Sequence, residues 1–214
     1  MKFRVRERRK PLITVFVLLV VVFESIAFAA SIPTPSQQLF QFYVLGPNEL
    51  AAEYNPNSNN PNIGVDTTVT WYLGLTNNMG SVQLVAIRIE LSNATMPSPK
   101  DAQLESPAPV ITDFARFVQN NETWIVPFVW SITNSTSSDG STHITGLRIN
   151  NATYQLTNWS ATKGNNFRIV FELWTWQIDD SAFEFGWIGN GQHQSAWLEV
   201  WFNMTTLGPI APPP

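Results

Sequence analysis

The chain of 214 residues contains no cysteine, which excludes disulfides, thiol catalysis and thiolate metal sites. Small secreted eukaryotic domains usually depend on disulfides, so their absence indicates a prokaryotic protein that is stabilised by a sizeable core. Charged residues make up only 13% of the chain, and there are two histidines. The sequence also lacks a phosphate-binding loop, a nucleophile elbow and any Ser/His pair. We therefore expect neither catalytic residues nor a cofactor.

The first thirty residues have the order of an export signal. Six Lys or Arg lie within residues 1–10, an apolar run follows over residues 12–23, and small residues end at Ala27-Phe28-Ala29-Ala30. This is the pattern of a secretory signal peptide, and twelve apolar residues are fewer than the roughly 20 that span a bilayer. We predict a signal peptide or signal anchor over residues 1–29, with cleavage after Ala29 favoured over retention in the membrane.

Removal of residues 1–29 leaves six basic and 14 acidic residues, a net charge of −8. A nucleic-acid partner is not expected, because such proteins carry a basic footprint. The remaining chain divides into a Pro-containing tether (30–39), one domain (40–206) and a Pro-rich tail (207–214). The expected location is outside the cytoplasm, either secreted or held by the N-terminal segment.

Short alternating strands separated by turn residues predict the fold. Apolar residues alternate in residues 65–75, 82–91, 124–132, 167–178 and 197–204, whereas residues 51–64 read as loop and residues 111–119 fit either a strand or a helical turn. No segment shows a clear amphipathic helix. The pattern indicates an all-β, antiparallel two-sheet sandwich of immunoglobulin-like type. Residues 65–75 and 82–91, joined by a short turn, are expected to pair as a hairpin.

Several short motifs resemble a known family. They are FYVLGPNE from Phe42, Tyr54-Asn55-Pro56, residues 71–77, NETW from Asn121 with Pro127-Phe128, and AWLEVW from Ala196. Together they resemble the extracellular part of the archaeal domain-of-unknown-function family 1616. Glu49 replaces the Gly of that family, and residues 134–164 look like an insertion. The resemblance implies an exported, membrane-linked β-sandwich without established catalytic residues.

The polar groups suggest little chemistry. His143 and His193 have no further ligand at metal-site spacing, so no metal site is expected. Asp179 and Asp180, with Glu184 beyond, could hold Ca²⁺ but lack the pattern of a calcium loop, and a solvated turn is the better interpretation. Glu172 and Glu199 lie on two strands without a helper motif nearby; we interpret them as outward-facing surface residues rather than a glycosidase pair.

The tryptophans of the last two long strands form the sharper pattern. Alternation places Trp174, Trp176, Trp197 and Trp201 on the outward face, opposite the core residues. Exposed aromatic clusters of this kind mark interfaces or ligand platforms. Three alternatives stay open: residues 182–188 or the insertion cover the rings, the rings meet a partner or membrane-proximal surface, or they stack on sugars.

Six N-x-[ST] sequons make glycosylation possible after export. The candidates are Asn93, Asn121, Asn134, Asn151 and Asn158, whereas Asn203 falls inside a predicted strand. The leading functional hypothesis is a non-enzymatic cell-surface protein with a structural or adhesion role, whose partners are the membrane and envelope proteins or glycans. A carbohydrate-binding module is the first alternative, and a surface filament subunit, built by strand addition of the tether, is the second.

Overall fold

The computed structural model describes residues 15, 16, 18–25, 28, 38–100, 104–157 and 159–205. The chain divides into two units, Met1–Ser36 and Gln37–Pro214. In the first unit the described residues are helical. No helix in the described part of the chain is long and apolar enough to cross a membrane. The Ala27-Phe28-Ala29 site (apart from Phe28), most of the tether, the tail and Asn158 lie outside the described residues.

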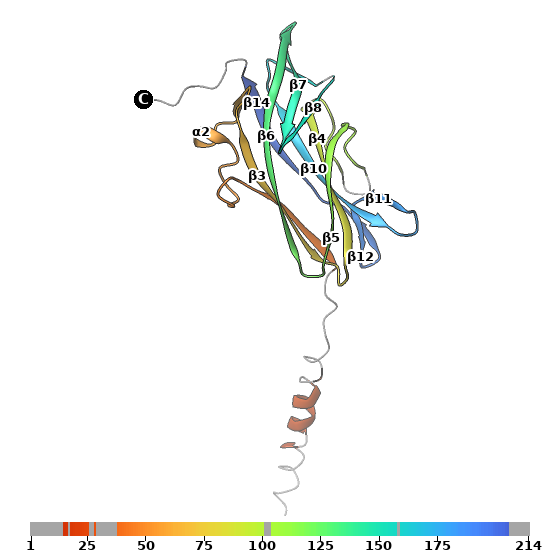
Figure 1. Ribbon diagram of the computed structural model, residues 1–214. Coiled ribbons are helices and arrows are strands. Elements are labelled where there is room, and N and C mark those ends of the chain that lie inside the picture. The colour runs from red at the N-terminus through yellow and green to blue at the C-terminus, as the bar shows by residue number, and fades with distance from the viewer. Residues whose placement is uncertain are drawn as a thin grey trace, which may run out of the picture. The chain divides into compact units, whose positions relative to one another are not determined.

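Strands dominate the second unit and form two sheets (Figure 1). The first sheet has the order β1-β3-β6-β7-β8, with β9 on β7. Its strands are β1 (Leu39–Leu45), β3 (Val69–Asn78), β6 (Thr123–Ser138), β7 (Ser141–Ile149), β8 (Ala152–Gln155) and β9 (Ser160–Thr162). The segment that looked like an insertion thus builds the far edge of this sheet.

The second sheet has the order β2-β14-β10-β4-β5, with β11 on β10. Its strands are β2 (Asn62–Gly64), β4 (Gln83–Asn93), β5 (Val110–Val118), β10 (Phe167–Gln177), β11 (Ala182–Phe185) and β14 (Trp197–Thr205). The hairpin of β12 (Trp187–Gly189) and β13 (Gln192–Gln194) is separate, and the short turn α2 covers Pro56–Asn59. Apart from the parallel β2–β14 pair, the strands of both sheets pair antiparallel.

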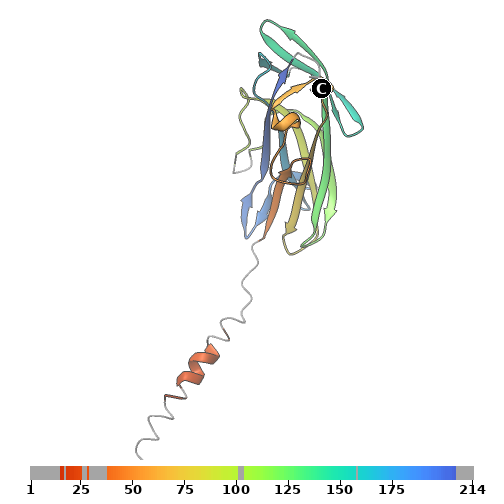
Figure 2. The same cartoon turned by 90° about the vertical axis from the view of Figure 1, so that its left-hand side faces the viewer.

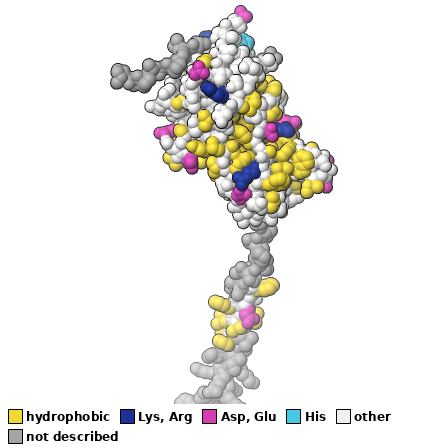
Figure 3. Space-filling model, viewed as in Figure 1, with side chains coloured by type: hydrophobic (Ala, Val, Ile, Leu, Met, Phe, Trp, Pro, Cys, Tyr) yellow, Lys and Arg dark blue, Asp and Glu magenta, His cyan; other side chains and the backbone are white. Residues whose placement is uncertain are grey.

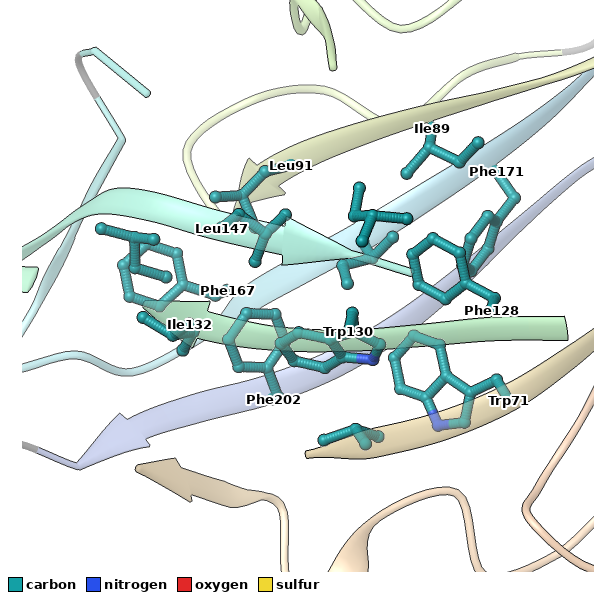
Figure 4. Packing of buried hydrophobic residues seen from close by; sticks show 14 of the residues in the cluster. Trp71, Ile89, Leu91, Phe128, Trp130, Ile132, Leu147, Phe167, Phe171 and Phe202 are labelled. Atoms are coloured by element: carbon teal, nitrogen blue, oxygen red, sulfur yellow. The ribbon is translucent and has the colours of Figure 1, made fainter. Parts of the chain in front are cut away.

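The two sheets pack face to face, which confirms the all-β, immunoglobulin-like sandwich (Figure 2). Large aromatic side chains from both sheets meet between them (Figure 4). Trp71 and Phe128 of the first sheet stack with ring centres 5.9 Å apart, and Phe128 meets Phe171 of the second sheet edge-to-face at 5.1 Å. Trp130 and Phe202 also join the sheets, as a tilted pair with ring centres 5.0 Å apart. Aromatic pairs of this geometry add to the burial of apolar surface, so the core needs no disulfide.

The predicted hairpin of residues 65–75 and 82–91 is wrong. β3 pairs with β1 and β6, whereas β4 pairs with β10 and β5, so the two strands belong to different sheets. The reason is the turn at Asn77: its buried amide donates to the carbonyls of Ser81 and Val118, both at 2.9 Å, and its Oδ1 accepts from the amide of Met79. These bonds carry the chain from one sheet to the other.

The structure corrects the prediction for one further segment and decides between the two alternatives for another. The loop predicted for residues 51–64 contains β2, whose parallel pairing to the end of β14 no local pattern signals. Residues 110–118 form a strand rather than a helical turn. The last two long strands pair antiparallel, with Phe167 opposite Phe202 and Glu172 opposite Trp197.

Candidate functional site

The outward face of the second sheet carries the buried charged side chains of the described part of the chain. Alternation places Glu172 and Trp174 of β10 on this face, as predicted, together with Arg168 of β10 and Glu90 of β4. The face is not open to solvent, however: Glu90, Arg168 and Glu172 are at most 2% exposed. The β4–β5 connection, described over residues 94–100 and 104–109, covers it.

Arg168 holds this connection on the sheet. Its Nη1 donates to Ser98 Oγ at 2.5 Å and to Glu199 Oε1 at 2.9 Å, and its Nη2 donates to the carbonyl of Met96 at 2.7 Å. The guanidinium also lies 4.9 Å from the centre of the Trp201 ring. Glu199 is therefore the ion-pair partner of a buried arginine.

Glu172 corrects the sequence interpretation. We expected a surface carboxylate, but its side chain is fully buried. Oε1 accepts from the amide of Ser106 at 2.6 Å, and Oε2 accepts from Trp174 Nε1 at 2.9 Å. Glu172 faces Trp197 across the ladder and Glu199 faces Val170. The two carboxyls thus have separate partners, and the covering connection, which alternation cannot reveal, removes Glu172 from solvent.

A second buried carboxyl, Glu90, was missed by the sequence reasoning. Burial, reinforced by the negative charge of Glu172, raises the pKa of Glu90 to about 8. Burial also raises the pKa of Glu172, against the hydrogen bonds from Ser106 and Trp174. Both effects follow from the cost of placing a charge in a poorly solvated site. Perturbed carboxyls of this kind occur at functional sites and in structural networks alike; here both oxygens of Glu172 already have protein partners.

The four predicted tryptophans do not form one platform. Trp174 is 8% exposed, because Phe185 packs at 5.9 Å and the Arg88 guanidinium lies 3.4 Å from its ring centre. Trp197 is half-buried against the same Phe185. The alternative in which residues 182–188 cover the rings thus holds for these two tryptophans.

Trp176 and Trp201 stay exposed, at 37% and 42%. Trp176 lies edge-to-face with Phe183 at 5.3 Å. Trp201 pairs with Arg168, which precedes Trp176 by eight positions on β10, so the two exposed rings are separated by roughly 25 Å of strand. One small ligand cannot contact both rings.

A recess of about 250 Å³ opens beside Trp174. Its lining combines aromatic rings and polar groups from four chain segments: Trp174, Phe183, Phe185, Glu105, Glu184 and His193. His193 Nε2 lies 2.8 Å from the carbonyl of Phe185, so this nitrogen carries the proton. The recess offers ring faces beside carboxylate acceptors, which suits a ligand with hydroxyl or ammonium groups. No sequence motif could reveal it, because tertiary contacts assemble it.

The remaining predicted positions stand apart. His143 Nε2 lies 3.3 Å from Ser138 Oγ in the β6–β7 hairpin, far in sequence from His193. Asp179 and Asp180 are exposed in the β10–β11 turn. Within the described residues, no group of three or more His, Asp or Glu could hold a metal ion.

The sequons fall at different kinds of position. Asn121, Asn134 and Asn151 are exposed, whereas Asn93 and Asn203 are partly buried. Asn203 lies within β14, as the sequence pattern predicted.

Comparison with known proteins gives only a faint likeness. Neither a family model nor a curated protein matches the chain. Among solved structures, the chain is similar to the CARDB domain of a Pyrococcus furiosus protein, crystallised in complex with di-metal ions. The identity is 10% and the TM-score 0.37, over 82% of this chain and 100% of that one.

Proposed function

We propose that the chain is an exported cell-surface β-sandwich that acts by binding other envelope components rather than by catalysis. The basic, apolar and small-residue order of residues 1–30 supports export. The resemblance of the FYVLGPNE and AWLEVW stretches to the extracellular part of the archaeal family supports the same location. Cleavage after Ala29 releases the domain from its signal segment.

One observation carries the binding role: large apolar side chains remain exposed at the end of the sandwich where β1 begins. Leu39 is opposite Asn78, and Gln38 accepts a hydrogen bond from the amide of Asn190, so the β3–β4 turn and the β12–β13 hairpin share this end. The exposed side chains here, called the apolar end, are Val82, Phe117, Trp176, Ile178 and Ile188. Figure 3 shows hydrophobic side chains gathered around β11, in the lower part of the domain. Exposed apolar groups that gather in this way typically mark interaction sites.

The charges at this end favour a protein partner with basic residues. Ile178 is 84% exposed and is followed directly by Asp179 and Asp180. These carboxylates repel an anionic lipid surface but complement Lys or Arg around an apolar contact. A protein surface of that composition is the occupant we propose.

Retention in the envelope tests this function. Full-length protein with Ile178→Asp and, as a matched control, Leu50→Asp (61% exposed, in the turn after β1) is produced in the native cells. For the population that begins at Ala30, we expect the fraction in washed envelopes to fall several-fold for Ile178→Asp and to stay unchanged for Leu50→Asp. Equal retention of both folded variants would contradict the proposal. Recovery of most of the protein with Met1 intact would show that the cleavage prediction is wrong.

A carbohydrate-binding role is the second candidate, and the recess beside Trp174 is the observation that favours it. Carboxylates of Glu105 and Glu184 accept hydrogen bonds from sugar hydroxyls, and the Phe and Trp rings offer apolar faces. Trp176 and Trp201, roughly 25 Å apart along the strand, suit a long polysaccharide better than a monosaccharide.

Polysaccharide binding by calorimetry or on glycan arrays separates the two candidates. Trp176→Ala and Trp201→Ala each weaken binding if a chain of sugars follows the second sheet, whereas Ile125→Ala, a similarly exposed apolar residue on β6 of the first sheet (39%), leaves it unchanged. If all three variants bind as the unchanged protein does, the exposed tryptophans have no such role.

A further inference from the structure

The described sequons divide into two classes by what their amide groups contact. Asn93 and Asn203 use their side chains to hold the fold together. Asn121, Asn134 and Asn151 are exposed, and within the described residues their side-chain amides make no hydrogen bond. The sequence motif is the same at all five positions, so the distinction comes from the structure.

The amide of Asn93 links β4 to β9. Its Nδ2 donates to the carbonyl of Ser160 at 2.7 Å. Its Oδ1 accepts from both the amide and the hydroxyl of Thr95, at 2.9 and 2.7 Å. The hydroxyl that completes this sequon is therefore bound to the asparagine itself. A sugar on Nδ2 would compete with the bond to Ser160.

The amide of Asn203 links three segments. Its Nδ2 donates to Asn62 Oδ1 at 3.2 Å, and its Oδ1 accepts from the amide of Asn166 at 3.0 Å. Asn62 belongs to β2, which pairs with β14 at this position. A glycan here would displace β2 from the edge of the second sheet.

The side chains of Asn121, Asn134 and Asn151 face solvent and, within the described part of the chain, do not link segments of the fold. Asn134 lies at an irregularity of the β6–β7 ladder, where the register shifts on both sides of it. Asn121 and Asn151 lie in the β5–β6 and β7–β8 turns. In each of these sequons the hydroxyl residue, Thr136, Thr123 or Thr153, is also exposed, and the Thr123 hydroxyl lies 2.8 Å from that of Thr76 rather than against its own asparagine. A transferring enzyme can therefore reach both parts of the motif.

We propose that Asn121, Asn134 and Asn151 are N-glycosylated and that Asn93 and Asn203 are not. The donor is an oligosaccharide joined through its anomeric carbon to a lipid phosphate. The new bond joins Asn Nδ2 to that carbon, the bond from carbon to the phosphate oxygen breaks, the lipid phosphate leaves with the electron pair, and Nδ2 loses one proton. The inference rests on the proposed export, because such donors act outside the cytoplasm.

The arrangement has a consequence for binding. All three sites lie between residues 121 and 151, on the first sheet and the turns that flank β6 and β8. Trp174, Trp176 and Trp201 belong to the second sheet. Glycans on Asn134 and Asn151 would therefore lie on the first sheet and not on the strands that carry the exposed rings of Trp176 and Trp201. A glycan on Asn121 would lie in the β5–β6 turn, whose backbone bonds to Asn77 at the end of β3.

Site-resolved mass spectrometry tests the assignment on full-length protein purified from the cells that make it. We expect intact glycopeptides for Asn121, Asn134 and Asn151 and unmodified peptides for Asn93 and Asn203. Thr136→Ala is expected to remove one glycan mass without touching Asn134, and Thr136→Ser to restore it. Circular dichroism confirms that both variants fold.

The outcomes separate the two proposals. Protease treatment of intact cells and the N-terminal residue report export on the same sample. A chain that stays inside the cell overturns the proposed function and the glycan assignment together. An exported chain that is bare at Asn121, Asn134 and Asn151 overturns the assignment alone. Folded protein that carries a glycan on Asn93 or Asn203 would show that the hydrogen bonds of these side chains do not prevent glycosylation.

Discussion

Glu90 couples the stability of the protein to pH. The outward face of β4 places this carboxyl beside Glu172, Arg88 and Glu105, and burial raises its pKa from 4.5 to about 8. Between these values the folded chain keeps a proton that the unfolded chain releases. The free energy of unfolding should therefore fall as pH rises through this window, by up to about 1.4 kcal/mol per pH unit.

Urea unfolding at several pH values within that window measures this effect. We expect a shallower pH dependence for Glu90→Gln and a flatter one still when Glu172→Gln is added, because burial raises the pKa of Glu172 as well. Glu49→Gln, in the exposed turn after β1, serves as the control and should keep the slope of the unchanged protein. An unchanged slope in Glu90→Gln would refute the role of this group.

Glu49 itself carries backbone strain. Its φ of 56° lies in the left-handed region, where a side chain costs about 1–2 kcal/mol, and the resembled family has Gly at this position. Glu49→Gly should raise the free energy of unfolding, by less than about 1 kcal/mol after the greater flexibility of Gly in the unfolded chain is counted. Chemical denaturation checks the sign, and a loss of stability would show that Glu49 makes a compensating contact.

At the scale of elements, Gly186 joins the strands around the recess. Its amide donates to the carbonyl of Leu173 at 2.9 Å, and its carbonyl accepts from Thr175 Oγ1 at 2.5 Å. With φ at 85°, a Cβ here would lie 2.0 Å from the carbonyl oxygen of Gln194. Backbone cannot give way as a flexible side chain can, so a Cβ at this position would push the Gln194 end of β13 away from Gly186.

Gly186→Ala should therefore destabilise the fold by more than the strain of placing a side chain at positive φ, because the added Cβ also clashes with backbone. Gly140→Ala is the matched control, because Gly140 also has positive φ (73°) but nothing within 4 Å of the added Cβ. We expect the free energy of unfolding to fall by about 1 kcal/mol in the control and by at least about 1 kcal/mol more in Gly186→Ala, as measured by chemical denaturation. Equal losses would mean that the strands around the recess shift freely.

For the whole molecule, the aromatic core predicts folding without metal. Trp71, Phe128, Trp130, Phe171 and Phe202 join the two sheets, and the described residues hold no metal-binding cluster. We expect a chelator to leave the thermal unfolding midpoint unchanged. Elemental analysis of protein purified without chelator checks this independently, and a stoichiometric ion would contradict it.

The period-two alternation of apolar residues was enough to predict the all-β sandwich and the inward faces of its long strands. This follows because a strand turns successive side chains to opposite faces, whatever it packs against. The position of the tryptophans of β10 and β14 on the outward face was predictable for the same reason. The three exposed sequons were visible as motifs, although their separation from Asn93 and Asn203 was not.

The separation of β3 and β4 into different sheets, the burial of Glu172 and the recess depend on contacts between distant segments. A short turn between alternating strands is compatible with a hairpin or with a crossing between sheets, and the hydrogen bonds of Asn77 select the crossing. Outward orientation likewise does not mean exposure, since Ser106 and its neighbours cover Glu172 from the β4–β5 connection. Alternation reports which face a side chain occupies, whereas burial depends on what packs over that face, and that is a property of the folded chain alone.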